Sequence, residues 1–255
     1  MKKAKEEHYS DFIELAGRNT CNTVYPMAIA EGAQRGDIYT DNTEKPQYAL
    51  FWHESGFAYL SGHPKPEDLD EVYALMKNES GNNPRRFVLE TNDEPVARYF
   101  RGKEEIEEHP RFGLRFRKLQ PEEDIPKGYE LREIDEDLLS RIEGRVVPLN
   151  FWSSAEEFLT KGKGYCLIRN DEVATVAFSA AVSSRQIDIG IETKEVYRRK
   201  GLAVIAAKKM AEYVLSIGKE PVWDCDAANA GSRATAEKVG FEVVSQYVYF
   251  KAKST

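Results

Sequence analysis

The stretch 198–203, Arg-Arg-Lys-Gly-Leu-Ala, has the residue types of an anion-binding loop. A helix is expected to begin at about Leu202, so its first N–H groups have no acceptor within the helix and its dipole is positive there. Gly201 has no side chain to keep a phosphate away from the main chain. Arg199 and Lys200 add positive charge at the same point. These features predict a binding site for a diphosphate.

The elements around this loop alternate between strands and helices. Before the loop, we expect strands at 129–133, 164–169, 172–183 and 186–192, a helix at 135–143, and a second helix opened by Ser153 with Glu156 three residues later, which is the capping-box pattern. After it we expect a long helix at 202–217, a strand at 221–225, a helix at 230–239 capped by Asn229, and a strand around 242–251. This half of the chain is therefore predicted to be mixed α/β.

The first half of the chain has its own set of elements. We expect two short helices within 11–31, a β-hairpin over 48–60, a helix at 67–77, and three short strands at 86–90, 96–100 and 111–118. The segment 120–128 contains two prolines and three acidic residues, which is typical of a linker. We therefore predict two domains, 1–124 and 125–255, which agrees with a length of 255 residues.

The composition is that of a globular protein, with 41% hydrophobic, 31% charged and 11% aromatic residues. The net charge of −7 does not favour a broad basic surface for nucleic acid. Residues 1–10 lack the apolar stretch of a secretory signal, and no run of about 18 apolar residues predicts a membrane span. Three cysteines, and four histidines without metal-binding spacing, favour neither disulfides nor a metal site. We expect a cytoplasmic protein without metal, and with neither nucleic acid nor membrane as partner.

The order of elements in the second half resembles the GNAT family of acyl-CoA-dependent N-acyltransferases. The residues that carry the resemblance are the loop 198–203 between a strand and a long helix, then a strand, the helix begun by Asn229, and the pair Gly240-Phe241. The resemblance covers about 128–250 and is greatest to the zwittermicin A N-acetyltransferase-like proteins. It implies a mixed, mostly antiparallel twisted sheet flanked by helices. The N-terminal α/β domain has no assigned role, and a degenerate copy of the same fold is one interpretation of it.

The resemblance also implies acetyl-CoA as co-substrate and assigns its parts to the chain. The diphosphate is expected on the main-chain N–H groups of the loop, and the pantetheine beside the strand around 191–193. The implied coenzyme-binding residues are Ile191, Thr193, Arg198, Arg199, Lys200, Gly201, Leu202, Ala203, Asn229 and Ser232. For Asn229 and Ser232, simple helix capping is the alternative role.

Catalysis in this family is implied to be a direct transfer, in which an amine attacks the thioester carbonyl and a carboxylate, or a water held by one, takes the proton of the amine. Asp188 and Glu192 are the candidate bases because they share the polar face of one strand, and the alternative is a pair of solvated acids. Many family members have a tyrosine as proton donor at the position of Ala236. Tyr247 or Tyr249 could replace it, or the thiolate could leave unassisted. Packing is the alternative role for both tyrosines.

Asn150 and Trp152 are candidate substrate-binding residues, because this fold builds part of its acceptor pocket between the first two helices of the domain. The alternative is that Phe151 and Trp152 staple the following helix to the core. We predict an acetyltransferase that acts on an amine of a small molecule. Two alternative functions stay open. The first is a non-catalytic acyl-CoA-binding module, and the second is acetylation of a protein or peptide amine. The sequence specifies neither the acyl chain length nor the oligomeric state.

Overall fold

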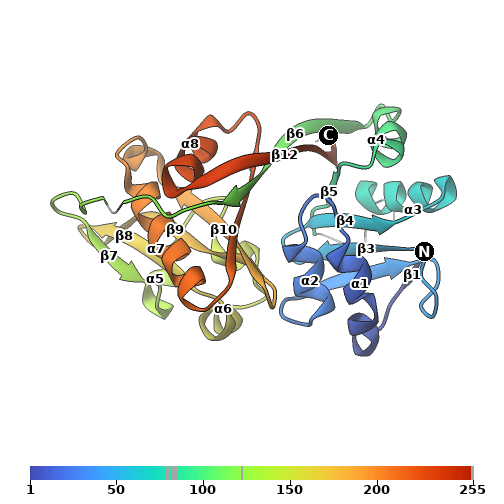
Figure 1. Cartoon of the computed structure of the whole chain (residues 1–255), viewed down its shortest axis with the longest axis horizontal. Helices are drawn as coiled ribbons and strands as arrows, with labels where there is room; N and C mark the ends of the chain where they lie inside the picture. Colours follow the sequence, from blue (N-terminus) through green and yellow to red (C-terminus); the bar gives the residue numbers. More distant parts are fainter. Residues whose placement is uncertain (79–80, 82–84, 122, 254–255) are drawn as a thin grey trace. The chain divides into compact units, whose positions relative to one another are not determined.

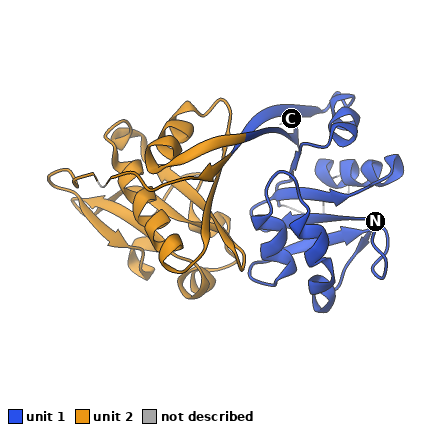
Figure 2. Cartoon of the chain, in the orientation of Figure 1, with its two compact units in different colours: residues 1–113, 245–255 blue, residues 114–244 orange. Residues whose placement is uncertain are grey.

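The computed structural model describes residues 1–78, 81, 85–121 and 123–253 (Figure 1). Contacts divide the chain into two compact units, which Figure 2 shows in different colours. Unit 1 consists of Met1–Gly113 and Ser245–Thr255, and unit 2 consists of Leu114–Val244. The chain therefore passes from unit 1 into unit 2, and its last residues return to unit 1.

Unit 2 contains a mixed, mostly antiparallel sheet flanked by helices, as the sequence predicted. Strands β7 (Glu130–Glu133), β8 (Gly164–Arg169), β9 (Glu172–Val182) and β10 (Gln186–Thr193) pair antiparallel in that order, and β11 (Glu220–Asp226) joins β10 in parallel. A parallel pair needs a crossover connection, which α7 (Leu202–Ser216) provides. The other helical segments are α5 (Glu136–Ser140), η2 (Pro148–Asn150), α6 (Ala155–Lys161), η3 (Glu195–Tyr197) and α8 (Ala230–Val239).

Helix α7 packs on the sheet of unit 2 through its apolar side chains. Leu202 and Ile205 of α7 share one core cluster with Leu167 of β8 and Ala174 of β9. Burial of a side chain of leucine size stabilises the fold by roughly 1.5–3 kcal/mol. Because Leu202 is itself in this cluster, the packing fixes the first turn of α7, which follows the predicted anion loop.

Unit 1 is built on strands that pair in a similar way. Its elements are β1 (Lys2–Lys3), η1 (Glu6–Phe12), α1 (Ile13–Gly17), α2 (Val24–Ala30), β2 (Gly36–Thr40), β3 (Tyr48–His53), β4 (Phe57–Gly62), α3 (Pro66–Lys77), β5 (Val88–Thr91) and α4 (Glu94–Arg101). Strands β2, β3 and β4 are antiparallel, and β3 with β4 confirms the predicted hairpin. Strand β5 pairs with β4 in parallel, after the crossover helix α3.

The two halves of the chain repeat one order of elements. Each has a first strand, short helical segments, three antiparallel strands, a crossover helix, a parallel strand, a second helix and a last strand, which is β6 (Ile106–Phe116) or β12 (Phe241–Ala252). In strand order, β12 lies next to β5 and β6 lies next to β11, so the last strands are exchanged between the halves. The topology agrees with the interpretation of the first half as a copy of the same fold.

The division into units differs from the expected domains 1–124 and 125–255. The linker-like segment 120–128 lies inside unit 2, and the chain changes unit within β6 and β12 instead. Turn-forming composition marked the segment as a linker, but strand pairing places the end of the chain in unit 1, where Tyr249 pairs with Glu90 of β5.

The structure corrects two local predictions and contains a strand in 36–40 that was not predicted. Residues 96–100, expected as a strand, belong to helix α4, because the Asp93 side chain accepts from Val96 N–H at 3.0 Å and caps the helix. Helix α6 begins one residue later than predicted, since Ser154 is the N-cap and accepts from Glu157 N–H at 3.1 Å.

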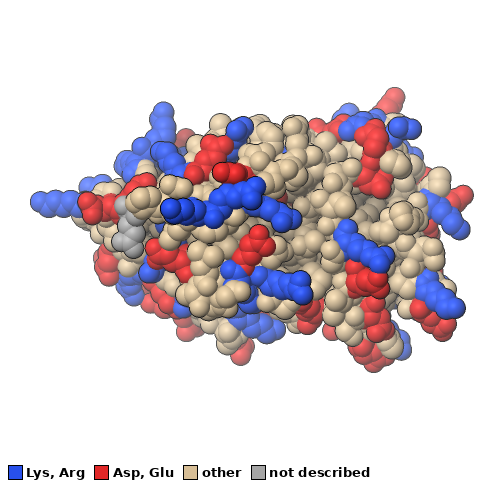
Figure 3. Space-filling view, viewed as in Figure 1, with Lys and Arg blue, Asp and Glu red and all other residues tan. Residues whose placement is uncertain are grey.

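The surface carries both signs of charge. On the face that Figure 3 shows, basic and acidic side chains are interspersed. Among the residues described, no helix has the length and apolar character needed to cross a membrane.

Candidate active site

The predicted anion loop enters α7 through a left-handed backbone. Arg199 has a φ of 61°, and Gly201, the N-cap residue, has a φ of 79°. No side chain caps the helix, and its first turn contains no acidic residue. Val204 N–H bonds back to Gly201 O at 3.0 Å. The N–H groups of Leu202 and Ala203 have no acceptor within the helix, so they can donate to an anion.

Strands β10 and β11 separate toward the end of β10. Their parallel ladder covers 186–188 opposite 220–222, although β10 continues to Thr193 and β11 to Asp226. On its other side, β10 stays paired with β9 as far as Thr193 opposite Thr175. The main-chain groups of 189–193 that face away from β9 therefore border an opening, where an extended ligand can pair with them. This edge contains Ile191 and Thr193, where the resemblance predicts the pantetheine.

The equivalent turn of unit 1, between β4 and α3, has lost the anion-binding properties. Residues 62–66 are Gly-His-Pro-Lys-Pro, and Pro66 in the first turn of α3 has no N–H to donate. The Asp68 carboxylate accepts from Lys65 N–H at 2.8 Å, so a negative charge already lies at the start of this helix. Of the two turns, the one before α7 therefore has the main chain that is better suited to an anion.

A cavity of ≈ 290 Å³ lies at the end of β10. Its lining residues come from the segment after α5 and from the segment that leads into the anion loop, and they are Glu143, Gly144, Arg145, Glu192, Thr193, Lys194, Glu195 and Arg198. Arg198 donates from Nε to Thr193 O at 3.2 Å. The cavity therefore adjoins both the open strand edge and the first residue of the loop.

Glu192 joins this cavity to the segment after α5. Its Oε2 accepts from the main-chain N–H groups of Arg145 at 3.2 Å and Val146 at 3.1 Å. Its Oε1 lies 3.9 Å from Arg198 Nη2. No site role was predicted for 143–146. The contact joins residues 46 positions apart, so only the fold reveals it.

The candidate catalytic groups lie in different surroundings. Asp188 is 5% exposed and is the last residue of β10 in the ladder with β11, where the opening begins. The Glu192 side chain is 19% exposed. The structure thus places two candidate carboxylates on the strand that borders the opening. Tyr247 is buried and belongs to unit 1, and Ala236 in α8 is buried as well.

The polar side chains at the start of α8 both have partners within unit 2. Asn229 is the N-cap, and its Oδ1 accepts from Ser232 N–H at 3.0 Å. Ser232 Oγ accepts from the indole N–H of Trp223 at 3.1 Å. These contacts match the capping role that was left open as the alternative to coenzyme contact.

The two candidate acceptor residues differ in position. Asn150 is exposed and donates from Nδ2 to Arg145 O at 2.9 Å, which places it beside the segment that lines the cavity. Trp152 is 2% exposed, and its indole N–H donates to Ser179 O at 2.8 Å. Its ring also contacts Phe158 edge to face, with centroids 6.0 Å apart. The position of Trp152 matches the alternative role in packing.

The cysteines of unit 2 are buried in strands. Cys166 lies in β8 and Cys225 in β11, and neither forms a disulfide with another described residue. Burial raises the pKa of the Cys166 thiol to about 11. Because the thiolate is the nucleophilic form, Cys166 is unreactive near neutral pH.

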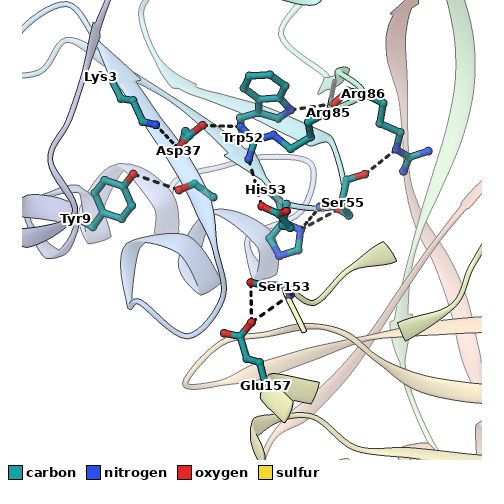
Figure 4. Close-up of polar contacts among 12 residues, drawn as sticks. Lys3, Tyr9, Asp37, Trp52, His53, Ser55, Arg85, Arg86, Ser153 and Glu157 are labelled. Carbon is teal, nitrogen blue, oxygen red and sulfur yellow. Dashed lines mark hydrogen bonds and ion pairs between the residues drawn. The ribbon is translucent and has the colours of Figure 1, made fainter. Parts of the chain in front are cut away.

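Unit 1 contains a separate polar network around β3 (Figure 4). Asp37 binds Arg85 at 2.6 Å, and the Arg85 guanidinium lies 3.8 Å from the centre of the Trp52 ring. His53 is fully buried, and its Nδ1 accepts from Ser55 N–H at 3.1 Å, so the proton of the neutral ring is on Nε2. Burial, and to a lesser extent the charge of Arg85, lowers the pKa of His53 to about 3.

Comparisons with known proteins agree with this geometry. The chain is 25% identical to an uncharacterized N-acetyltransferase of Bacillus subtilis (strain 168), YdfB, over 98% of both chains. A crystal structure of a GCN5-related N-acetyltransferase-like protein from Streptococcus suis 89/1591 matches with a TM-score of 0.76 and 25% identity, over 97% of this chain and 99% of that one. A tandem GNAT protein from the clavulanic acid biosynthesis pathway shares the fold, with a TM-score of 0.60 and 11% identity over 96% of this chain and 93% of that chain.

The family model described as GNAT acetyltransferase matches residues 15–250, which spans both repeats. The predicted resemblance covered only the second half of the chain, and the match extends it to the first. On this match, together with the anion loop and the open strand edge of unit 2, the protein is an acetyltransferase that belongs to the GNAT family.

Proposed function

We propose that the protein transfers acetyl from acetyl-CoA to an amine of a small molecule, by direct attack in a ternary complex. The observation that carries the proposal is the opening between β10 and β11, which lies on the strand that leads into the uncapped first turn of α7. A strand edge and a helix start in succession suit a ligand with an extended amide-containing arm and a diphosphate.

In this proposal the coenzyme binds along unit 2. The diphosphate accepts from the N–H groups of Leu202 and Ala203, with Arg199 and Lys200 supplying positive charge. The pantetheine amides pair with the main chain of 191–193 on the side away from β9. Asn229 and Ser232 stay candidate contacts from α8, although each already has a partner within the fold.

The chemical step forms a C–N bond and breaks the C–S bond of the thioester. The amine gives its proton to a carboxylate of β10 or to a water held by it, and Asp188 lies where the strands begin to separate. The departing thiolate takes a proton from solvent in this proposal, since Ala236 has none to give and Tyr247 is buried in unit 1. A thiol with a pKa of about 8.5 is also a tolerable leaving group without a donor. No cysteine nucleophile is needed.

The cavity of ≈ 290 Å³ at the end of β10 lies on the path of the coenzyme in this proposal, because Thr193 and Arg198 line it. Asn150 holds the segment that forms one wall of this cavity, so its role as an acceptor residue is indirect in this proposal. Kinship with the zwittermicin A N-acetyltransferase-like group and a cytoplasmic location are further parts of the proposal, and both rest on the sequence.

The rival function is a non-catalytic acyl-CoA-binding module, which the alanine at position 236 favours. Turnover separates the two. Calorimetric titration with acetyl-CoA tests binding, and release of free thiol from acetyl-CoA in the presence of primary amines tests transfer. Absence of acetyl-CoA binding by the wild-type protein would exclude both functions, whereas binding without thiol release for any amine would favour the module.

A further inference from the structure

Glu192, one of the two candidate bases, is engaged by the main chain of another segment. Its Oε2 accepts two consecutive N–H groups, those of Arg145 and Val146, at 3.2 and 3.1 Å. Hydrogen bonds to an ionised acceptor are stronger than bonds between neutral groups. Two such bonds on one oxygen therefore hold the segment 144–146 against β10.

Gly144 is the residue that permits this contact. Its φ is 140°, a backbone conformation that residues other than glycine rarely adopt. A Cβ at this position would lie 2.7 Å from Glu192 Cγ and 3.1 Å from its Cδ. The segment therefore approaches the Glu192 side chain more closely than any residue with a Cβ allows.

Two further contacts complete the arrangement. Asn150 donates to Arg145 O at 2.9 Å, so both main-chain groups of Arg145 are bound, one by Glu192 and one by Asn150. The Arg198 guanidinium lies 3.9 Å from Glu192 Oε1, on the side of the anion loop. Lys194 Nζ lies 3.6 Å from Glu143 Oε2 across the same cavity.

We propose that Glu192 is a positioning residue, which sets the wall of the cavity at the end of β10 by holding 144–146 and does not take the proton of the amine. The inference rests on the proposed function, because that function takes the coenzyme past this cavity and the proton of the amine to a carboxylate of β10. A base must reach the amine, but Oε2 of Glu192 receives two N–H groups at a point about 13 Å along β10 from Asp188, where the strands begin to separate. Asp188 is then the carboxylate of β10 that serves the proton transfer.

The test compares Glu192→Ala with Glu192→Gln. A glutamine amide oxygen accepts both N–H groups but cannot act as a base near neutral pH, so it rescues positioning and not base catalysis. Hydrogen exchange of the Arg145 and Val146 amides measures the contact without any ligand. We expect Glu192→Ala to speed exchange at both amides by about tenfold or more, and Glu192→Gln by less than about threefold. Glu130→Ala, at an exposed residue of β7, is the matched control.

Kinetics with acetyl-CoA and glycinamide as the probe amine give the second measurement. Glu192→Ala is expected to raise the KM for acetyl-CoA by about tenfold with a smaller effect on kcat, and Glu192→Gln is expected to recover most of that KM. The acidic limb of the pH profile of kcat/KM should be the same for Glu192→Gln and wild type. Loss of that limb, or a kcat lowered about 100-fold or more in the Gln variant, would mean that Glu192 is the base and overturn the proposal.

The outcomes separate this inference from the proposed function. Unchanged amide exchange in Glu192→Ala overturns the positioning role, whatever the protein binds. Failure of the wild-type protein to bind acetyl-CoA overturns the proposed function. The exchange result then still shows whether Glu192 holds the segment 144–146. If the wild type does not acetylate glycinamide, the exchange experiment decides by itself.

Discussion

Replacement of Gly201 by glutamate is expected to weaken acetyl-CoA binding by at least about 15-fold. A carboxylate about 5 Å from a diphosphate with two negative charges repels it by about 1.7 kcal/mol in water, from 332 × 2/(80 × 5), which corresponds to about 15-fold in Kd. The side chain also blocks approach to the main chain. The φ of 79° at this residue adds a folding cost of about 1–2 kcal/mol for any residue other than glycine.

Gly218→Glu is the matched control, because it places the same side chain on a similarly left-handed backbone at the other end of α7. Gly218 follows α7 with a φ of 73°, and a Cβ there meets no atom within 4 Å. The 15 residues of α7 separate the two sites by about 22 Å. Calorimetric titration with acetyl-CoA and thermal unfolding should show similar losses of stability in both variants, but a loss of affinity only in Gly201→Glu.

The reasoning about the anion loop predicts a salt dependence as well. Repulsion between exposed charges is screened over about 8 Å at physiological ionic strength, so the gap between the two variants should narrow as salt is added. Equal Kd values for Gly201→Glu and Gly218→Glu would refute the placement of the diphosphate at the start of α7. A gap that does not change with salt would refute the electrostatic part of the argument.

Three further predictions concern stability. Gly144→Ala should lower the free energy of unfolding by about 1–3 kcal/mol in denaturant titration, because the added methyl group overlaps Glu192. Ser232→Ala should cost about 1–3 kcal/mol by leaving the buried indole N–H of Trp223 without its acceptor, and an unchanged Kd for acetyl-CoA would identify Ser232 as structural. The pKa of His53 is lowered from 6.5 to about 3, so the unfolded chain binds a proton that the folded protein does not, and stability falls as the pH drops from 6.5 toward 3. Between pH 7 and 4.5 the wild type should lose about 2–3 kcal/mol relative to His53→Gln in urea titrations at each pH.

Local patterns predicted the second half of the chain well. Helix α8 and strand β8 have the predicted bounds, and α7 ends one residue earlier than expected. These elements carry strong local signals, which are an Asn cap, helical spacing of apolar residues, and glycines at the turns. The anion loop was predicted for the same reason, since a glycine before an amphipathic helix is a local feature. The error at α4 was also local, because Asp93 and Pro95 are helix-start signals that outweigh the short apolar run after them.

The surroundings of the candidate catalytic residues could not be predicted, because they depend on contacts between distant parts of the chain. Alternation on one strand placed Asp188 and Glu192 on a common face, but it cannot distinguish a carboxylate at the end of a ladder from one bound by a remote segment. The first is decided by the three-residue register of β10 with β11, and the second by Val146, 46 positions away. The same limit applies to the domain boundary. Composition can suggest a linker, but it cannot show with which strand β6 or β12 pairs. In a chain of two similar repeats, local patterns therefore identify the elements of each copy. The pairing of β12 with β5 determines that the end of β12 completes unit 1.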